Sequence, residues 1–396
     1  MTTAVSVGRS TLRDPVAAAR EAATSARKKL DGKAPTFALA FATTGYPLDT
    51  LCREVRTVVG PGATFGGCSG EGIISGDASN ESNHAVAVLL MASTSIQVDV
   101  VASESYARDS AVSAKELGEK IRAMRDVFAV MVLTDGLGGD CTAFLQTLAR
   151  EVPCPNIVGG AAADAMVFEK TFQFVGERVL SGAACALVFR GQGELRYSVS
   201  HGCSAIGPER TVTRAAGGWV QEIDGRPAWS VFKEYLDGDP QDLNADGIVH
   251  LCIGTPLEAG GDTSDATKCV IRTPLALDKA TGALMFPGGG LEAGQRIRMT
   301  RRDADRIRQT AVECADSVSH GQQARPSAVF QFDCAGRGKV MFGSCASDEI
   351  VKPLQERMSA EVPWIGFHTY GEIAPLRGEP RYHNYTVALC ALYERA

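Results

Sequence analysis

The sequence lacks the features that mark membrane, secreted and nucleic-acid-binding proteins. Its apolar runs, such as Val127–Leu133, have the length of a strand and are too short to span a bilayer. Residues 1–9 contain no apolar core of the kind that a signal peptide needs. No basic block is flanked by aromatic residues, and the net charge of −6 gives no attraction to nucleic acid or to an anionic membrane. We therefore expect a soluble, cytoplasmic protein without a nucleic-acid or membrane partner.

The sequence also lacks a CxxC pair, although it contains 12 cysteines. Without such a pair a structural zinc site is not expected. The chain is too long, and its cysteines too evenly spaced, for a disulfide framework. Several of them lie inside apolar segments, as Cys185 and Cys390 do, where a free thiol behaves as a small buried hydrophobe. Reduced thiols are also what the cytoplasm maintains.

What is present is an ordinary globular composition on a chain long enough for two domains. The 396 residues are 45% hydrophobic and 22% charged. Residues 201–225 differ from the segments before and after them. They contain a glycine-proline turn at His201–Pro208 and then two strand-like runs that end at Asp224 and Gly225. We place the domain boundary there, which predicts domains at 1–224 and 225–396.

Three segments of the chain repeat one order of elements. Each has a strand, a glycine turn, a helix, a second strand that ends at glycine, and a final strand. The first strands are Phe37–Phe41, Phe128–Leu133 and Ala328–Phe332, the helices lie near 48–58, 142–152 and 349–358, and the final strands are Ala85–Met91, Ala183–Phe189 and Thr386–Leu392.

The repeated order predicts the fold class. A strand, a helix and a second strand form a parallel crossover, which is expected to be right-handed. We therefore predict an α/β protein of two domains, with mixed, largely parallel sheets built from repeated strand–helix–strand–strand units. The glycines would lie at the carboxyl edges of these sheets, where open α/β sheets usually bind ligands.

The glycine segments and their neighbours carry a resemblance to a known family. In order, they are residues 66–72 (GGCSGEG), 158–164 (VGGAAAD), 202–208 (GCSAIGP), 222–228 (EIDGRPA), 332–338 (FDCAGRG), 366–375 (GFHTYGEIAP) and 383–386 (HNYT). Together they cover nearly the whole chain. In this order they resemble the FIST family of prokaryotic signal-transduction sensors, which have an N-terminal and a C-terminal FIST domain.

The resemblance implies a sensory module that binds small molecules such as amino acids. Some members are similar to the haem-binding, nitric-oxide-sensing NosP type, which regulates a partner histidine kinase. For this chain, that would make haem a candidate cofactor. The sequence contains no kinase, cyclase or F-box segment, so signalling would need a separate protein partner.

The expected ligand is an amino acid or a small carboxylate, bound at the domain interface or at the carboxyl edge of a sheet. Arg337 offers a planar fork that suits a carboxylate, while Glu71 and Glu372 suit an ammonium or amide group. The alternatives stay open: each Glu could accept backbone N–H bonds and fix its own turn, and Arg337 could pair with a local Glu. The predicted ligand-binding residues are Gly67, Cys68, Ser69, Glu71, Gly160, Cys334, Arg337, Tyr370 and Glu372.

Two further hypotheses rest on histidine and cysteine. His368 follows the third glycine and could ligate haem iron. Cys68 or Cys334 could act as a nucleophile with His368 or His383 as the base, which would make the chain an enzyme. No spacing enforces such a pair and no oxyanion-hole pattern accompanies it, so no catalytic or metal-binding residue is assigned. Residues 287–290 (PGGG) complete neither a dinucleotide-binding nor a Walker pattern and are predicted to be a loop.

Overall fold

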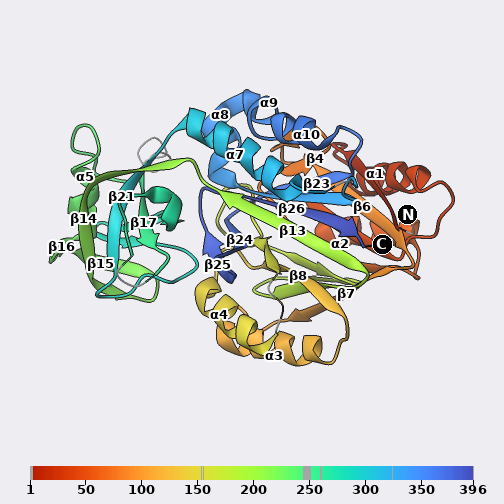
Figure 1. Cartoon of the computed structure of the whole chain (residues 1–396), viewed down its shortest axis with the longest axis horizontal. Coiled ribbons are helices and arrows are strands. Elements are labelled where there is room, and N and C mark those ends of the chain that lie inside the picture. The colour runs from red at the N-terminus through yellow and green to blue at the C-terminus, as the bar shows by residue number, and fades with distance from the viewer. Residues whose placement is uncertain are drawn as a thin grey trace.

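The computed structural model describes residues 3–152, 154, 156–243, 251–258, 261–322 and 324–395. These residues form two bodies of mixed α and β structure (Figure 1). The larger one, called here the α/β body, consists of residues 3–200 and 304–395 and contains three six-stranded sheets. The smaller one, called the β body, consists of the described residues of 203–302 and is built on one antiparallel sheet. The boundary predicted at 224/225 falls between two strands of that sheet and stays a prediction.

The three sheets of the α/β body share one order of strands. The first is β1(Thr3–Ser10)-β6(Val86–Ser93)-β2(Phe37–Ala42)-β3(Thr64–Ser69)-β10(Gln173–Val175)-β11(Arg178–Leu180). The second is β7(Ile96–Ser103)-β12(Ala184–Gly191)-β8(Val127–Thr134)-β9(Ile157–Ala161)-β24(Gly371–Leu376)-β25(Glu379–His383). The third is β13(Gly193–Ser200)-β26(Val387–Glu394)-β22(Ala328–Cys334)-β23(Trp364–Thr369)-β4(Ile73–Ser75)-β5(Ala78–Asn80).

Each of these sheets ends in a hairpin that comes from another of the three sequence segments. Hairpin β10–β11 of the second segment pairs with β3 of the first. Hairpin β24–β25 of the third segment pairs with β9 of the second, and hairpin β4–β5 of the first pairs with β23 of the third. The segments therefore exchange their hairpins in a closed cycle.

The sheets are mixed, as the sequence predicts, but parallel pairing is limited to one pair of strands in each sheet of the α/β body. These pairs are β2–β3, β8–β9 and β22–β23, the two strands that flank each crossover. The final strand of each segment and the exchanged hairpin both return antiparallel. The repeated order of elements is thus seen in part, and the sheets are not largely parallel.

The helices cover the outer faces of the three sheets. In Figure 1, α3 and α4 lie on one side of the α/β body and α7, α9 and α10 on another. Their bounds are α1 Pro15–Lys29, α2 Leu48–Val59, α3 Ser110–Arg122, α4 Cys141–Glu151, α7 Ala304–Ser319, α8 Lys339–Phe342, α9 Ala346–Ile350 and α10 Lys352–Met358, and short 3-10 helices are η2 Ala335–Arg337 and η3 Gly343–Cys345. Within the described ranges, no helix has the length and apolar composition needed to cross a membrane.

Sequence signals explain where the predicted helices begin. Asp14 precedes α1 and its carboxylate accepts the Ala17 N–H at 2.7 Å, while Pro15 occupies the first turn. Asp303 caps α7 in the same way through the Arg306 N–H at 2.9 Å. The small side chains on the inner face of α1 let it lie close against β1, because a Cβ atom at Gly8 would overlap the Ala22 carbonyl.

The β body is a curved antiparallel sheet with a short helix. Its strand order is β18(Cys269–Arg272)-β17(Leu251–Pro256)-β21(Arg296–Arg302)-β14(Cys203–Ala216)-β15(Trp219–Ile223)-β20(Ala283–Met285)-β19(Ala276–Asp278), with β16(Arg226–Pro227) paired to β15; its helices are α5 Ala228–Lys233 and the 3-10 helix η1 Ala266–Lys268. The chain enters it after β13 and returns to the α/β body at α7. The β body therefore lies between β13 and α7, which both precede the first strand of the third segment.

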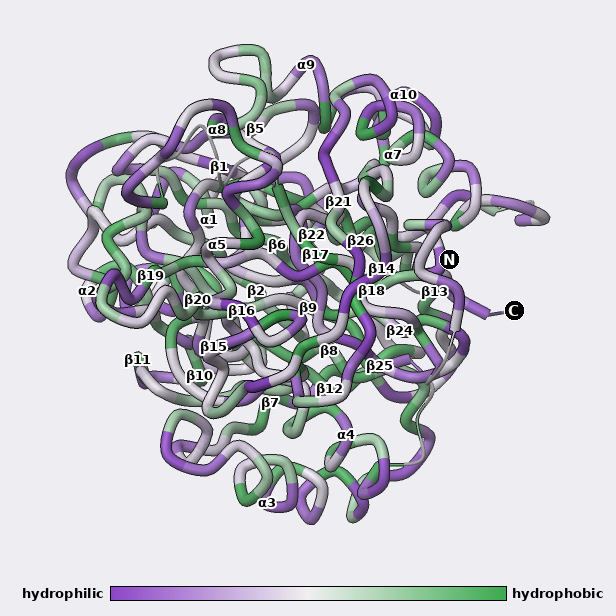
Figure 2. The backbone as a smooth tube through the Cα atoms, turned by 90° about the vertical axis from the view of Figure 1, so that its left-hand side faces the viewer, coloured by the Kyte–Doolittle hydropathy of each residue, from purple (hydrophilic) through white to green (hydrophobic). Residues whose placement is uncertain are grey.

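The inner faces of the three sheets meet in one aromatic core. Phe41 of the first sheet lies 4.6 Å from Phe367 of the third, measured between ring centroids. Phe189 of the second sheet lies 6.1 Å from Phe330 of the third. The two chain ends lie side by side on this body in Figures 1 and 2, and the Thr3 N–H donates to the Glu394 carboxylate at 3.3 Å.

The glycines at the second parallel strand of each segment serve close packing between strands. A Cβ atom at Gly67, Gly159 or Gly366 would overlap the carbonyl oxygen of Ala40, Val132 or Gln331, respectively, on the neighbouring parallel strand. The same steric requirement for glycine thus occurs at equivalent places in three sheets. These glycines are explained by the fold before any ligand is considered.

We expect Gly366→Ala to lower the free energy of unfolding by about 1–3 kcal/mol, because the strand must shift to relieve the overlap with Gln331. Gly62→Ala is the matched control, since no atom lies within 4 Å of the added Cβ there. Urea unfolding followed by circular dichroism measures both midpoints. Equal midpoints for the two variants would contradict the packing role.

Candidate functional site

The structure brings several predicted residues together where the carboxyl ends of β3, β9 and β23 meet. The Glu71 N–H donates to the His368 carbonyl at 2.9 Å, and the His368 N–H donates to the Gly72 carbonyl at 2.8 Å. The Tyr370 N–H donates to the Ala161 carbonyl at 3.1 Å. We call Ser69, Glu71, Asp164, His368 and Tyr370 the sheet-end cluster.

Four of the predicted ligand residues are buried in roles that the fold itself requires. The Ser69 hydroxyl donates to the Ala163 carbonyl at 2.7 Å and accepts the Phe172 N–H at 3.0 Å. Gly67 lies opposite Phe174 in the pairing of β3 with β10, and Gly160 lies opposite Glu372 in the pairing of β9 with β24. Cys68 is fully buried in the aromatic core. None of the four offers a free polar group of its side chain to a ligand.

Glu372 fixes its own surroundings, which is the alternative that the sequence left open. It is fully buried, and its carboxylate accepts the Thr386 N–H at 3.0 Å and the hydroxyls of Thr386 and Thr369. Burial raises its pKa to about 8, against the effect of these hydrogen bonds. A carboxylate bonded in this way joins β24 to the start of β26.

Arg337 pairs with an aspartate rather than with a local glutamate. Its Nε donates to Asp333 Oδ1 at 2.7 Å, and both side chains are wholly buried. Its two terminal nitrogens have no partner in the described part of the chain. Asp333 in turn pairs with His368 between β22 and β23. Arg337 therefore has a local acidic partner, and its role toward a ligand stays a prediction.

Glu71 keeps an unused carboxylate oxygen in the sheet-end cluster. Its pKa is raised to about 7, mainly by burial and in smaller part by the nearby Glu81 and Asp164, while the Met166 N–H and Lys339 oppose the shift. Its Oε2 has no hydrogen-bond partner among the described residues. Tyr370 lies beside it, and burial together with the hydrogen bond to Asp164 raises the pKa of the Tyr370 phenol. A group that titrates near neutrality therefore lies at this meeting point.

His368, the predicted axial ligand of haem, is packed inside the α/β body. Its side chain is fully buried, and its Nε2 shares a hydrogen bond of 2.7 Å with the Ser79 hydroxyl and lies 3.6 Å from Glu81 Oε1. It lines none of the cavities described below, so binding haem would require the imidazole to leave this packed position.

The nucleophile hypothesis gains no support from the thiols. Burial raises the pKa of both Cys68 and Cys334, which is the opposite of what thiolate formation needs. His383 bonds the Ala374 carbonyl at 3.0 Å through Nε2, and burial lowers its pKa to about 3. No residue is therefore given a catalytic role.

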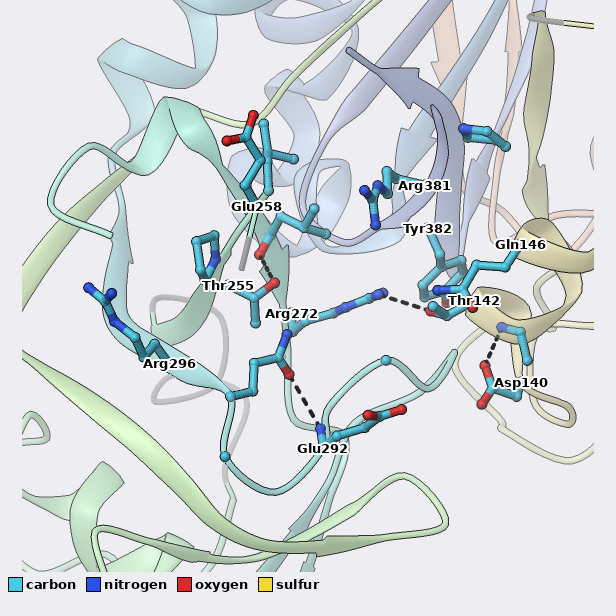
Figure 3. Close-up of a pocket in the computed structure, with 18 of the residues that line it drawn as sticks. Asp140, Thr142, Gln146, Thr255, Glu258, Arg272, Glu292, Arg296, Arg381 and Tyr382 are labelled. Carbon is cyan, nitrogen blue, oxygen red and sulfur yellow. Dashed lines mark hydrogen bonds between the residues drawn. The ribbon is translucent and has the colours of Figure 1, made fainter. Parts of the chain in front are cut away.

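A cavity of about 500 Å³ lies between the two bodies, where the sequence predicts no binding residue (Figure 3). We call it the inter-body cavity. The start of α4 and strand β25 form its wall on the α/β body, with Thr142 and Tyr382. Strand β18 and the loop after β20 form its wall on the β body, with Arg272 and Glu292. Two smaller or more polar hollows lie elsewhere, at α7 and beside β1.

Arg272 is the principal polar group of the inter-body cavity. It ends strand β18, is only 4% exposed, and extends toward α4 in Figure 3. Its Nη2 donates to Thr142 Oγ1 at 3.1 Å, and its guanidinium carbon lies 5.3 Å from the centroid of the Tyr382 ring. Nε and Nη1 have no partner among the described residues, and burial lowers the pKa of the group. A buried guanidinium with two unused donors suits a carboxylate or a phosphate.

A loop of three glycines closes one side of the inter-body cavity. Gly288, Gly289 and Gly290 have φ values of 78°, 70° and 81°. The Gly288 carbonyl accepts hydrogen bonds from the Thr142 N–H at 3.0 Å and from the Thr142 hydroxyl at 2.8 Å. A Cβ atom at Gly288 or Gly289 would overlap Tyr382 or Asp140, respectively. We call residues 287–290 the glycine strap, since it crosses from the β body to the first turn of α4.

The first turn of α4 contributes the favourable electrostatic field of a helix N-terminus, but its Thr142 and Ala143 N–H groups are already bonded. Asp140 caps the helix and accepts the Ala143 N–H at 2.9 Å, while the glycine strap already takes the Thr142 N–H. The arginine is therefore the group that would bond an anion directly. Arg381 on β25 adds a second guanidinium, whose Nη2 bonds Glu379 and whose buried Nε has no partner in the described ranges.

Two signals in the sequence point to this cavity in retrospect. An arginine closes the otherwise apolar strand Cys269–Arg272, and buried arginine is rare without a partner. The glycine strap is a loop, as the sequence predicts, and three consecutive glycines are typical of a close backbone approach. Neither signal identifies the facing residues, Thr142 and Tyr382, which come from distant segments.

Comparison with known proteins gives the family. An uncharacterized protein of Mycobacterium tuberculosis is 28% identical over 398 residues, covering 97% of this chain and 98% of the relative. An uncharacterized protein of Mycobacterium bovis is 27% identical over 394 residues, covering 97% of each. Among solved structures, a cyanuric acid hydrolase is similar over the whole of both chains, at 9% identity and a TM-score of 0.39, which is too low to support an inference. The FIST N domain matches residues 36–226 and the FIST C domain matches residues 228–375. The chain therefore belongs to the FIST family of sensory, small-ligand-binding domains.

Proposed function

We propose that this chain is a sensory protein that binds a small carboxylate, such as an amino acid or another small organic acid, in the inter-body cavity. The observation that carries the proposal is Arg272, a buried guanidinium with two unused N–H donors facing a cavity of about 500 Å³. The family supports a small ligand in general. The carboxylate class and the location are inferred from the chemistry of the cavity.

Arg272 is buried, and its hydrogen bonding to the described residues is incomplete. An ionised group that is buried without full hydrogen bonding destabilises the folded state. A carboxylate placed against Nε or Nη1 of Arg272 would satisfy one of these donors with a charge-assisted hydrogen bond. Binding would thus recover a cost already present in the free protein. Glu292 and Asp140 at the cavity wall disfavour ligands whose negative charge is spread over the whole molecule.

The position of the cavity suggests how binding becomes a signal. Thr142 and Tyr382 belong to the α/β body, whereas Arg272 and the glycine strap belong to the β body. A ligand that contacts both walls favours the arrangement of the bodies in which its contacts are complete. A separate signalling protein, such as the histidine kinase that the family resemblance suggests, would read that arrangement.

A thermal-shift screen of mono- and dicarboxylates, amino acids and inorganic phosphate tests the ligand class. A ligand at 100 times its Kd stabilises the protein by about 2.7 kcal/mol, which gives a rise in Tm of several degrees. We expect at least one carboxylate to do this, and Arg272→Met to abolish the effect. Arg301→Met, at an exposed arginine outside the cavity, is the matched control and should respond like the wild type. A screen in which no carboxylate raises the Tm would contradict the proposal.

The stability of arginine variants without ligand tests whether burial of the Arg272 guanidinium destabilises the folded state. We expect Arg272→Met to leave the Tm unchanged or to raise it, because a side chain of similar length replaces an incompletely bonded charge. Arg302→Met is the matched contrast: that arginine is also 4% exposed, but it donates to the Gly336 carbonyl at 2.6 Å and lies 3.9 Å from the Tyr385 ring centroid. Arg302→Met should lower the free energy of unfolding by about 1–3 kcal/mol. Differential scanning calorimetry measures both, and a clear fall in Tm for Arg272→Met alone would argue that the residue is structural.

A further inference from the structure

The segment 164–170 adopts a backbone conformation that its residues disfavour. Ala165, Met166 and Phe168 have φ values of 62°, 56° and 57°, in the left-handed region, and none of them is glycine. Such conformations cost free energy and persist only where the surroundings impose them; they are frequent in segments that switch. Three of them in four residues single out this segment, called here the 164–170 loop.

One buried carboxylate imposes the conformation of the 164–170 loop. Asp164 is 3% exposed, and its Oδ1 accepts the Phe168 N–H at 3.0 Å. Its Oδ2 accepts the Glu169 N–H at 2.7 Å and the Lys170 N–H at 2.8 Å. The loop is therefore wound around a single side chain.

The 164–170 loop also presents apolar side chains to solvent. Met166 is 36% exposed, Val167 is 56% exposed and Phe168 is 46% exposed. Only three other large hydrophobic side chains in the described part of the chain are exposed to this degree, and they lie apart in the sequence, at Leu12, Val112 and Val340. A strained backbone thus holds three neighbouring apolar groups away from the core.

Tyr370 contacts the 164–170 loop at three points. Its hydroxyl donates to Asp164 Oδ1 at 2.7 Å and accepts the Met166 N–H at 2.9 Å. Its ring stacks on that of Phe168, with centroids 5.1 Å apart and planes inclined by 22°. A displacement of Tyr370 would therefore change the contacts of the Asp164 carboxylate, the Met166 amide and the Phe168 ring together.

Tyr382 connects Tyr370 to the inter-body cavity. Its hydroxyl donates to the Tyr370 carbonyl at 2.9 Å, and its ring lines the cavity below the Arg272 guanidinium. A Cβ atom at either Gly288 or Gly371 would overlap this ring, so the ring touches the backbone of the glycine strap and of the residue after Tyr370. One rigid side chain thus bridges the ligand wall and the strand that carries Tyr370.

We propose that the 164–170 loop is the output element of the inter-body cavity, and that Tyr382 and Tyr370 transmit the occupancy of Arg272 to it. This inference rests on the proposed function, because it assigns a regulatory readout to the same cavity. A carboxylate bound to Arg272 changes the contacts of the guanidinium with Thr142 and the Tyr382 ring. The shift of Tyr382 alters Tyr370, and the strained loop then adopts a second arrangement in which Met166, Val167 and Phe168 are presented differently to a partner.

Hydrogen–deuterium exchange of the full chain tests the connection, because the amides of Met166, Phe168, Glu169 and Lys170 donate to Tyr370 or Asp164 and report directly on the loop. Tyr382→Phe removes only the hydroxyl that bonds the Tyr370 carbonyl. We expect it to raise exchange at these amides about tenfold, as loss of one hydrogen bond worth about 1.4 kcal/mol predicts. Arg272→Met should also change their exchange, although the residue touches no part of the loop.

Tyr393→Phe is the matched control, since that hydroxyl donates to the Val318 carbonyl at 3.1 Å elsewhere in the body. It should leave the loop amides unchanged. If Tyr370→Phe raises their exchange while Tyr382→Phe and Arg272→Met do not, Tyr370 has a local role only and the proposed transmission is overturned.

A second arm separates this inference from the proposed function. Succinate is added at a concentration that saturates the wild type in the thermal-shift assay, or the best carboxylate of that screen is used if succinate does not bind. Binding that leaves loop exchange unchanged overturns the transmission but not the ligand site. Loop exchange that responds to Tyr382→Phe and Arg272→Met, in a protein that no carboxylate stabilises, supports the connection and rejects the ligand class.

Discussion

The structure depends on backbone hydrogen bonds that each sheet of the α/β body receives from another segment. Strands β3, β9 and β23 would be exposed edges if the segments folded alone, and an exposed edge is prone to incorrect pairing. The hairpins β10–β11, β24–β25 and β4–β5 cover them in turn. Because every hairpin crosses over where a parallel strand ends, the three crossings converge, and this convergence creates the sheet-end cluster.

The same constraint explains why buried ionisable residues are frequent there. Where segments of the chain cross, backbone N–H and C=O groups are no longer paired within a sheet and need side-chain partners. Glu372 supplies acceptors to Thr386, Asp164 supplies acceptors to the 164–170 loop, and Ser69 joins Ala163 to Phe172. Glycine and carboxylate at a sheet edge are thus as characteristic of a crossing as of a binding site. Arg272 differs from these residues because two of its donors have no such use within the described chain.

The sequence predicts local structure well and long-range pairing poorly. Asp14, Asp303 and the periodic apolar positions locate α1 and α7, since a cap and its helix are neighbours in the chain. The repeated strands are visible because alternation and glycine spacing are local patterns. Exchange of hairpins leaves no such pattern, because Ile73 would look the same whether it paired with its own segment or with Phe367. For this reason the sequence pattern overestimates the extent of parallel pairing.

The candidate site shows the same limit. Arg337 and Glu372 have the chemistry of ligand contacts, but the sequence does not show which of their polar atoms already bond Asp333 and Thr386 in the fold. Arg272 and Tyr382 come from different bodies, so only the folded chain places them together.

The exchange of hairpins also has a consequence for synthesis. Strand β4 leaves the ribosome early, yet its partner β23 is made near the end of the chain, so β4 must wait unpaired through most of translation and is a natural target for chaperones.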